Sequence, residues 1–522
     1  MPTLEWIGKD KVINHHQEVP YRILDKKYTY NAESSENMII HGDNLLALKS
    51  LLPQYEGKVD CIYIDPPYNT GNEKWVYNDN VNDPRIKKWL GEVVGPEGED
   101  LSRHDKWLCM MYPRLKILYK LLSERGVIFI SIDDTEYANL KLLCDEIFGI
   151  SCFVSNMIWR SSDNSNNDAK QISSDHNSTL IYSKRPMWHP NKIFDESKRS
   201  HFKNLDNDPR GPHFDGNPLN SPNPRENLRF NIISPQGKVI APPPNGWRWS
   251  KETLQEKIDS GEIYFTDDGS SIRRRTYLCD MEGLPPSSLC VDINVTGSTR
   301  TAKYEQKSIF RELKASEVFP TPKPTALIQY VLSIGSSKDS IILDSFAGSG
   351  TTAHSVLKQN KQDGGNRKFI LVEMMDYADT ITAERVKRVI DGYGEGSKAV
   401  EGLSGDFSYY ELGAPLFNED KNLNEEVGED EIRKYVYYME TKLPLEVGAD
   451  DNRYYMGKAN DTAYYFYYEK NKPTTLNREF LSTVKTKASG YLIYADVCAL
   501  PKETLDKNGI VFKKIPRDIK KL

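Results

Sequence analysis

The stretch IILDSFAGSGTTAHSV, residues 341–356, combines the signals of a strand, a tight turn and a helix in one short run. Ile342 and Leu343 predict a buried strand, and a helix-forming segment begins at Thr351. The turn between them contains Gly348 and Gly350, which let the backbone approach a ligand closely. The first turn of a helix also offers free N–H groups. The stretch therefore predicts a cradle for a nucleotide-like cofactor.

An acidic residue at the end of the next predicted strand supports this cradle. The segment FILVEM places Glu373 at a position suited to hydrogen bonds with ribose hydroxyls, although a solvent-facing carboxylate is the alternative. No lysine follows Gly350, so the phosphate loop of an NTPase is excluded. The G-x-G-x-x-G spacing of NAD-binding proteins is also missing, because Gly350 is followed by Thr351, Thr352 and Ala353.

A second stretch, CIYIDPPYNTG at residues 61–71, ends a strand in an unusual way. The apolar run Cys61–Ile64 stops at an acid, two prolines and a tyrosine. Each proline removes a backbone donor and fixes one φ angle. The loop should therefore hold the Asp65 carboxylate and the Tyr68 ring in fixed relative positions, as a functional site requires. The alternatives are an ordinary turn residue and a surface aromatic.

Strand and helix signals alternate in two separate parts of the chain, residues 38–148 and residues from about 324 to 390. Such alternation predicts an α/β protein with a parallel sheet covered on both faces. The segment between them is rich in Pro, Gly, Asn and Ser, which indicates a loop-rich insertion into that sheet. Aromatic-rich segments beyond residue 405 predict a small C-terminal α+β domain. The predicted domains are 1–185, 186–315, 316–405 and 406–522.

Composition narrows the class of protein. With 38% hydrophobic residues and no apolar run long enough for a membrane span, we expect a soluble protein. The N-terminus has no signal core, and the seven cysteines are scattered, so we expect a cytoplasmic protein with reduced thiols and no metal site. The net charge is -6, yet residues 184–314 contain 21 Lys and Arg against 17 Asp and Glu. The middle of the chain is thus its basic part.

The two stretches together resemble DNA amino-methyltransferases that use S-adenosyl-L-methionine. DPPY at 65–68 precedes the insertion and FAGSG at 346–350 follows it, an order that resembles the β class, a permuted form of the fold. Similar family segments are HGDNL (41–45), HDKWLCMMYPRL (104–115), GVIFISIDDTEYANL (126–140) and FPTPKPTALI (319–328). GWRWS (246–250), GEIYF (261–265), GLPPSSL (283–289) and GDFSYYEL (405–412) resemble the modification (Mod) subunits of Type III restriction–modification systems.

The resemblance implies a permuted Rossmann-like methyltransferase fold with a target-recognition domain at 186–315. It implies methylation of adenine N6 in double-stranded DNA by the loop Asp65, Pro66, Pro67 and Tyr68. The implied cofactor-binding residues are Asp43, Asn44, Asp65, Lys323, Asp344, Phe346, Gly348, Ser349, Gly350, Thr351 and Glu373. For some of these a structural role is the alternative: helix capping by Asp43 and Asn44, a surface position for Lys323, and core packing for Phe346.

In the basic middle segment, Arg248 and the run Arg273, Arg274 and Arg275 are the candidate DNA-binding residues. A solvated surface is the alternative for them. The implied partners are DNA, a second copy in a homodimer, and a separate nuclease–helicase restriction subunit, with no membrane. Two other functions remain open: an N4-cytosine methyltransferase, and a DNA-recognition subunit that specifies targets for a separate nuclease.

Overall fold

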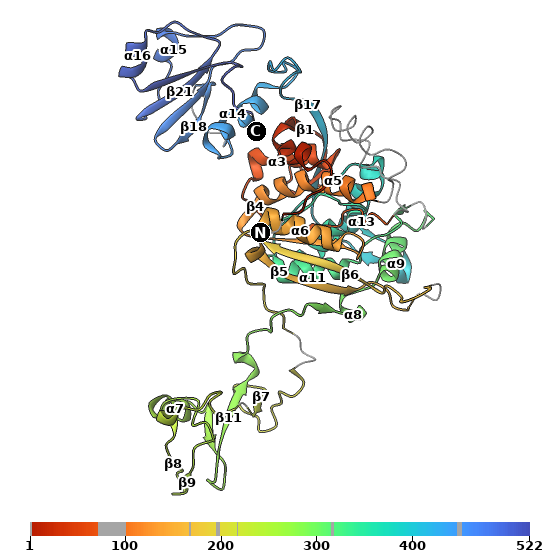
Figure 1. Ribbon diagram of the computed structural model, residues 1–522, viewed down its shortest axis with the longest axis vertical. Coiled ribbons are helices and arrows are strands. Elements are labelled where there is room, and N and C mark those ends of the chain that lie inside the picture. The colour runs from red at the N-terminus through yellow and green to blue at the C-terminus, as the bar shows by residue number, and fades with distance from the viewer. Residues whose placement is uncertain are drawn as a thin grey trace. The chain divides into compact units, whose positions relative to one another are not determined.

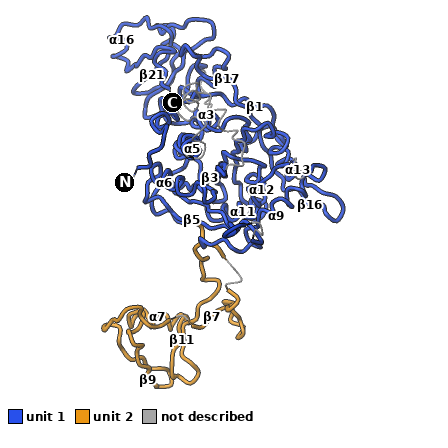
Figure 2. The backbone as a smooth tube through the Cα atoms, turned by 45° about the vertical axis from the view of Figure 1, so that its right-hand side comes forward, with its two compact units in different colours: residues 1–189, 287–522 blue, residues 190–286 orange. Residues whose placement is uncertain are grey.

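The computed structural model describes residues 3–70, 101–165, 169–194, 199–216, 218–314, 318–445 and 452–521. The chain forms two compact units, one of residues 1–189 with 287–522 and one of residues 190–286 (Figure 2). We call them the catalytic unit and the inserted unit. Among the described residues, no helix combines the length and the apolar character needed to cross a bilayer.

The catalytic unit is built on a ten-stranded sheet (Figure 1). In spatial order its strands are β1 (Arg22–Tyr30), β17 (Phe407–Pro415), β2 (Met38–His41), β14 (Lys368–Glu373), β13 (Ile341–Asp344), β3 (Val59–Ile64), β4 (Leu122–Ile132), β6 (His176–Ser183), β5 (Phe153–Arg160) and β12 (Leu289–Cys290). From β17 to β4 each neighbouring pair is parallel. The predicted α/β class is thus confirmed.

The two halves of the sequence meet in the middle of this sheet. Strands β2 and β3 follow one another along the chain, but β14 and β13, which come after the inserted unit, lie between them. In the pairing of β13 with β3, Ile342 lies opposite Cys61 and Leu343 opposite Ile62. One sheet is therefore shared by both halves, as the interrupted alternation predicts.

Helices cover both faces of the central strands. On one face α3 (Asn44–Tyr55), α5 (Leu101–Leu121) and α6 (Tyr137–Phe148) pack in a row and share a core with Ile62 and Ile64. On the other face lie α11 (Thr325–Gly335) and α12 (Thr351–Asp363), which pack together. A Cβ added at Gly335 of α11 would lie 2.7 Å from the Phe129 ring and 3.4 Å from Cys61 Sγ. Helix and sheet therefore touch closely there.

The insertion is shorter than the predicted domain 186–315. The inserted unit comprises residues 190–286, and residues 287–314 return to the catalytic unit as β12, α8 (Ile293–Thr296) and α9 (Thr299–Ile309). Helix α9 has the sequence TRTAKYEQKSI, and its buried residues are Ala302, Gln306 and Ile309. Its polar composition hides this narrow buried face from pattern analysis.

The C-terminal part contains a separate sheet, although the predicted boundary at 406 needs correction. Strand β17 joins the main sheet beside β2, and the residues after Pro415 belong to the same compact unit as that sheet. The separate sheet has the order β18 (Tyr455–Ala459), β19 (Thr462–Phe466), β21 (Gly490–Ala495) and β23 (Ile510–Lys514). The helices α14 (Glu429–Thr441), α15 (Arg478–Ser482) and α16 (Lys502–Lys507) lie in the same part of the chain, so helices and strands are mixed there, while a separate C-terminal domain stays a prediction.

The inserted unit has its own small core. It contains a three-stranded sheet of β10 (Ile263–Phe265), β11 (Ile272–Tyr277) and β7 (His213–Asp215), a hairpin of β8 (Ile232–Ile233) and β9 (Val239–Ile240), and α7 (Lys251–Asp259). The buried residues of its core are Ile240, Trp247, Leu254, Ile263 and Ile272. Trp247 of the GWRWS segment is thus a core residue.

Asn37 links the beginnings of the three neighbouring strands β2, β14 and β17. Its side-chain oxygen accepts a hydrogen bond from Phe369 N at 3.0 Å, and its amide donates to Asp406 O at 3.0 Å. Asn37→Ala should leave the buried Phe369 N–H without its partner and cost about 1–3 kcal/mol of folding free energy. Urea unfolding measures this loss.

The control is Glu36→Ala, one residue earlier. The Glu36 side chain is 78% exposed and pairs with Lys368, so its removal should cost about 0–1 kcal/mol. Equal unfolding midpoints for the two variants would contradict the bridging role of Asn37.

Candidate active site

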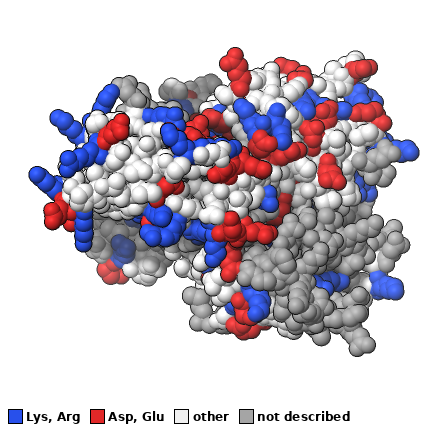
Figure 3. All heavy atoms as spheres, turned by 90° about the horizontal axis from the view of Figure 1, so that it is seen from above, with Lys and Arg blue, Asp and Glu red and all other residues white. Residues whose placement is uncertain are grey.

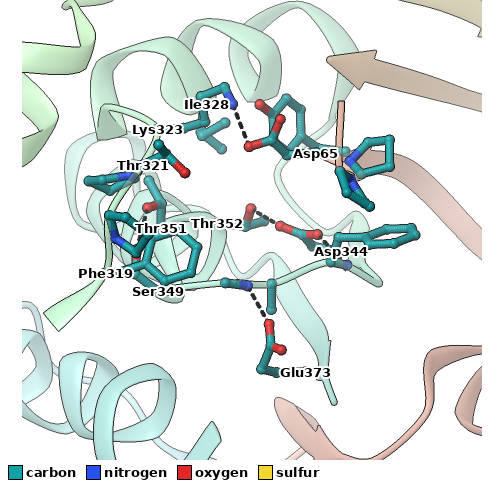
Figure 4. Close-up of a pocket in the computed structure, with 18 of the residues that line it drawn as sticks. Asp65, Phe319, Thr321, Lys323, Ile328, Asp344, Ser349, Thr351, Thr352 and Glu373 are labelled. Carbon is teal, nitrogen blue, oxygen red and sulfur yellow. Dashed lines mark hydrogen bonds and ion pairs between the residues drawn. The ribbon is translucent and has the colours of Figure 1, made fainter. Parts of the chain in front are cut away.

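Three adjacent strands end in carboxylates at one edge of the sheet. Asp65 follows β3, Asp344 ends β13, and Glu373 ends β14. Because parallel neighbours finish at the same edge, the three side chains converge on one cavity of about 620 Å³ (Figure 4). Ligands of open α/β sheets bind at such carboxyl ends, where the strand order changes direction.

Most residues that line the cavity come from five parts of the catalytic unit. These are the DPPY loop, the segment Phe319–Lys323, the glycine loop that leads into α12, the residues 373–377 at the end of β14, and a group from β5, β6 and α9. The lining residues are Tyr63, Asp65, Pro66, Pro67, Tyr68, Trp159, Asn177, Thr299, Phe319, Pro320, Thr321, Pro322, Lys323, Ile328, Asp344, Phe346, Ala347, Gly348, Ser349, Thr351, Thr352, Glu373, Met375 and Tyr377.

Both oxygens of the Asp65 carboxylate are engaged. The Tyr68 hydroxyl donates to Oδ1 at 2.8 Å, and the Lys323 ammonium pairs with Oδ2. Burial raises the pKa of the Tyr68 phenol, so the hydroxyl keeps its proton for this bond. Asn177 donates in turn to the Tyr68 oxygen at 3.1 Å. The Lys323 side chain is only 11% exposed, which excludes the surface role for this residue.

Residues outside the DPPY motif hold its loop in place. Trp107 is fully buried in α5 and donates from its indole nitrogen to Pro67 O at 2.7 Å. Asn69 has φ +64°, a left-handed conformation that asparagine tolerates, and its amide donates to the buried Glu136 carboxylate. Trp107 and Glu136 lie in two segments that resemble family segments, but the sequence predicted no role for either residue.

The glycine loop is fixed by the two other strand-end carboxyls. Asp344 accepts hydrogen bonds from Phe346 N at 3.0 Å and Thr352 Oγ1 at 2.6 Å. Glu373 accepts one from Gly348 N at 2.8 Å. Burial raises the pKa of Asp344 and of Glu373 to about 7. A ligand that brings hydroxyl donors or positive charge to these carboxyls would offset their desolvation.

The two glycines of the loop have different surroundings. Gly348 lines the cavity at φ +52°, and a Cβ added there would lie 2.9 Å from the Phe319 ring. Gly350 precedes α12 at φ +79°, and its added Cβ would lie 3.0 Å from Thr382 O. Gly350 is not among the lining residues, so it turns the backbone while Gly348 leaves room beside the ring.

Asp43 and Asn44 lie next to the site without lining the cavity. Asp43 caps α3, because its Oδ1 accepts from Leu45 N at 2.9 Å and from Leu46 N at 3.1 Å. Asn44 is buried and donates to Ser345 O at 2.8 Å, which braces the glycine loop from behind. The structure therefore shows Asp43 in the helix-capping role that was given as the alternative for this residue.

In the inserted unit, two of the candidate DNA-binding arginines are held in ion pairs. Arg274 contacts Glu262 at 2.8 Å. Arg275 contacts the carboxylates of Asp206 at 2.9 Å, Asp208 at 3.0 Å and Asp215 at 3.2 Å. Arg248 and Arg273 are exposed, and neither has an ion pair within the described residues.

The structure thus gathers most of the predicted site and leaves part of it outside. Eleven predicted residues line the cavity: Asp65, Pro66, Pro67, Tyr68, Lys323, Asp344, Phe346, Gly348, Ser349, Thr351 and Glu373. Sequence analysis missed Trp159, Asn177 and Thr299, since nothing marks single residues of antiparallel strands or of a polar helix. Phe319 also lines the cavity, and the sequence signal for it was its place as the first residue of the segment FPTPKP.

Comparison with known proteins identifies the class to which this fold and site belong. The sequence pattern of the DNA methylase family matches residues 59–384, which is more than half of the chain. The matched range begins at β3 and ends at the start of α13 (Glu384–Asp391), so it contains all three strand-end carboxyls. The chain belongs to the DNA methylase family.

Individual relatives agree with the predicted resemblance. The chain is 31% identical over 446 residues to the Type III restriction-modification enzyme StyLTI Mod subunit of Salmonella typhimurium, covering 79% of this chain and 66% of that protein. It is 33% identical over 362 residues to the Type II methyltransferase M.KpnI of Klebsiella pneumoniae, covering 65% and 81%. The predicted likeness to Mod subunits is confirmed.

The matches differ in how much of each protein they span. The chain covers 63–66% of the length of three Mod subunits, which is just under two thirds. A solved structure of the Thermus thermophilus protein TTHA0409, complexed with S-adenosyl-L-methionine, has 14% identity and a TM-score of 0.34, covering 72% of this chain and 99% of that one.

Gly348 and Gly364 both have a left-handed backbone conformation, but a Cβ added at Gly348 would meet the Phe319 ring and one added at Gly364 would meet open space. Gly348→Ala should strain the backbone and press on the Phe319 ring, so that affinity for the predicted cofactor S-adenosylmethionine falls at least tenfold. The control is Gly364→Ala. A Cβ added at Gly364, where φ is +66°, would meet no atom within 4 Å, so backbone strain should lower the free energy of unfolding by about 1–2 kcal/mol while the affinity for the cofactor stays unchanged. Calorimetric titration of both variants measures the difference, and equal affinities would contradict it.

Proposed function

We propose that this chain transfers a methyl group from S-adenosylmethionine to the exocyclic N6 of adenine in double-stranded DNA. One observation carries the proposal: the Asp65 loop and the glycine loop with Glu373 face the same cavity, from adjacent strands. A group that activates an amine and a cradle for an adenosyl cofactor are thereby within reach of one another. Membership of the DNA methylase family supports this reading.

The residues present fit the proposed cofactor. Glu373 and the glycine loop would hold the ribose, and Phe319 and Tyr377 would offer aromatic faces. Bound S-adenosylmethionine would supply an electrophilic methyl group on a sulfonium. The carboxyls of Asp344 and Glu373, whose pKa burial raises to about 7, would be stabilised in their charged form by that positive charge.

The DPPY loop supplies what an aromatic amine lacks. The N6 lone pair of adenine is delocalised into the ring, so the amine is a poor nucleophile. Asp65 can accept one N–H and the Pro66 carbonyl the other, which localises the lone pair on nitrogen for in-line attack. The two prolines fix these acceptors in advance, so little is lost in ordering them at the moment of reaction.

Access to N6 requires the base to leave the double helix. Tyr68, which lines the cavity, then offers a stacking face for the base, an interaction of about 1–3 kcal/mol. The Tyr68 hydroxyl is tied to Asp65 and Asn177, so the ring is held in orientation before a base arrives. Base recognition and amine activation would share one rigid loop.

The same site suits two further candidates less well. An N4-cytosine methyltransferase would use a similar loop, but it more often carries Ser in place of Asp65. A subunit that only specifies targets for a nuclease would not need the carboxylate. Type III Mod subunits among the relatives suggest that a separate restriction subunit and a second copy of this chain are partners. Nucleoside mass spectrometry of DNA methylated by the purified chain separates N6-methyladenine from N4-methylcytosine.

Asp65→Ala should reduce the methylation rate by about 10²–10⁴, because it removes the acceptor for the target amine. Affinity for S-adenosylmethionine should change much less. The control is Asp133→Ala: Asp133 follows the neighbouring strand β4 and does not line the cavity. Transfer of tritiated methyl groups to plasmid DNA measures the rates. Turnover of the Asp65 variant within threefold of wild type would exclude this role.

DNA contacts are proposed for the inserted unit. On the face drawn in Figure 3, acidic and basic side chains are interspersed over the described atoms. In the inserted unit, Arg248 and Arg273 remain exposed and without ion pairs among described residues, whereas Arg274 and Arg275 are neutralised. We therefore assign phosphate or base contact to Arg248 and Arg273 alone.

Arg273→Ala should weaken DNA binding and, for a phosphate contact, lower the slope of log affinity against log salt by about 0.9. Arg210→Ala is the control, since Arg210 is exposed but pairs with Asp280 at 2.6 Å. Fluorescence anisotropy with a labelled duplex at several salt concentrations measures both. If the two variants bind alike, Arg273 does not contact DNA.

A further inference from the structure

A buried arginine lies directly behind the glycine loop. Arg385, on α13, is fully buried, and its Nη1 donates to Ser349 Oγ at 2.9 Å and to Thr351 Oγ1 at 2.8 Å. Both hydroxyls belong to residues that line the cavity. A guanidinium therefore contacts this wall of the site from the protein side, at the first residues of α12.

The charge of Arg385 is balanced by a residue from the segment that returns from the insertion. Glu305 of α9 lies with Oε2 at 3.4 Å from Arg385 Nη2. Its carboxylate also accepts hydrogen bonds from the Thr325 hydroxyl and, at 3.3 Å, from Thr325 N. Thr325 starts α11, two residues after Lys323. One ion pair thus joins the glycine loop to the segment that carries Lys323.

Packing alone does not account for this arrangement. Desolvation of a buried ion pair is costly, and a well-packed apolar pair is often as stable or more stable. Burial lowers the pKa of Arg385 despite the nearby Glu305 carboxylate, and Arg385 Nε has no hydrogen-bond partner within the described structure. What the guanidinium adds is one nitrogen, Nη1, that donates to both hydroxyl oxygens at once. Its other terminal nitrogen, Nη2, lies 3.3 Å from His354 Nδ1 and 3.4 Å from the Glu305 carboxylate.

The bonds that Arg385 makes determine how these hydroxyls can act. Each oxygen accepts a bond from the guanidinium, so each hydroxyl keeps its proton as a donor. The two oxygens lie 3.4 Å apart, so at most one of the two protons is shared between them and at least one is left to donate to a ligand. Donors on Ser349 and Thr351 suit a carboxylate, and the amino-acid end of S-adenosylmethionine carries one. The N-terminus of the helix α12 favours negative charge at the same place.

We propose that Arg385 and Glu305 are positioning residues that orient the Ser349 and Thr351 hydroxyls toward the amino-acid end of the cofactor. This inference rests on the proposed function. It predicts a selective effect: loss of the pair should weaken ligands that have the amino-acid end and spare those that lack it. A role in folding alone would weaken both kinds of ligand equally.

The probes are S-adenosylhomocysteine, which has the amino-acid end, and 5′-methylthioadenosine, which lacks it. Calorimetry on the full chain should show that Arg385→Gln lowers affinity for the first at least tenfold and for the second less than twofold. Glu305→Gln should act in the same direction by about threefold. Arg388→Gln on the same helix is the control, because Arg388 pairs with Glu384 and Glu312 and not with the loop.

The binding results distinguish a failure of the proposed function from a failure of the positioning role of Arg385. If wild type binds neither probe, the proposed function fails. If wild type binds both and the Arg385 variant loses both by the same factor, or loses neither, the positioning role is overturned. Should Arg385→Gln fail to fold, the double variant Ser349→Ala and Thr351→Val takes its place, since it leaves Arg385 intact and removes only the oriented hydroxyls. The same selective loss supports the proposal, and unchanged selectivity refutes it.

Discussion

The contact on which the site depends is the pairing of β13 with β3. These strands come from either side of the inserted unit in the sequence, yet Leu343 lies opposite Ile62 in a part of the sheet that is buried on both faces. A slip by one residue would turn every side chain to the other face. Asp60 helps to fix the pairing, since its carboxylate accepts bonds from Ile341 N at 3.1 Å and Ser123 Oγ at 3.0 Å. Register therefore determines where Asp65 and Asp344 meet.

Bringing three carboxyls to one edge creates an electrostatic cost that the surroundings reduce in different ways. Lys323 supplies a positive charge to Asp65, while Asp344 and Glu373 receive hydrogen bonds from the glycine loop. These bonds do not outweigh burial, which still raises the pKa of both to about 7. The cavity is thus better suited to a cationic ligand than to an anionic one, apart from the hydroxyls in front of Arg385.

The sequence allowed prediction of what is encoded locally. Strands were predicted from the short apolar runs before Asp65 and Glu373, and a turn and a helix from the glycines before α12. The family resemblance then predicted that the two motifs form one site. Roles that depend on a distant partner could not be read in this way. Asp43 and Arg275 belong to motifs that suggested ligand contacts, and those contacts stay predictions. The helix cap made by Asp43 and the three carboxylates around Arg275 could be found only in the folded chain. Glu305 was hidden in a polar helix, because its partner Arg385 is far away in sequence.

The insertion leaves and rejoins the catalytic unit among the outer strands of the sheet, beyond β4, where it interrupts no central strand. It departs after β6 and returns as β12, whose Cys290 lies opposite Trp159 of β5. Trp159 lines the cavity, as does Thr299 at the start of α9, and Glu305 on the same helix contacts Arg385. The returning segment therefore connects the insertion to the walls of the cavity. Because the chain leaves and re-enters the sheet beyond β4, the insertion does not interrupt the pairing of β3 with β13 on which the site depends.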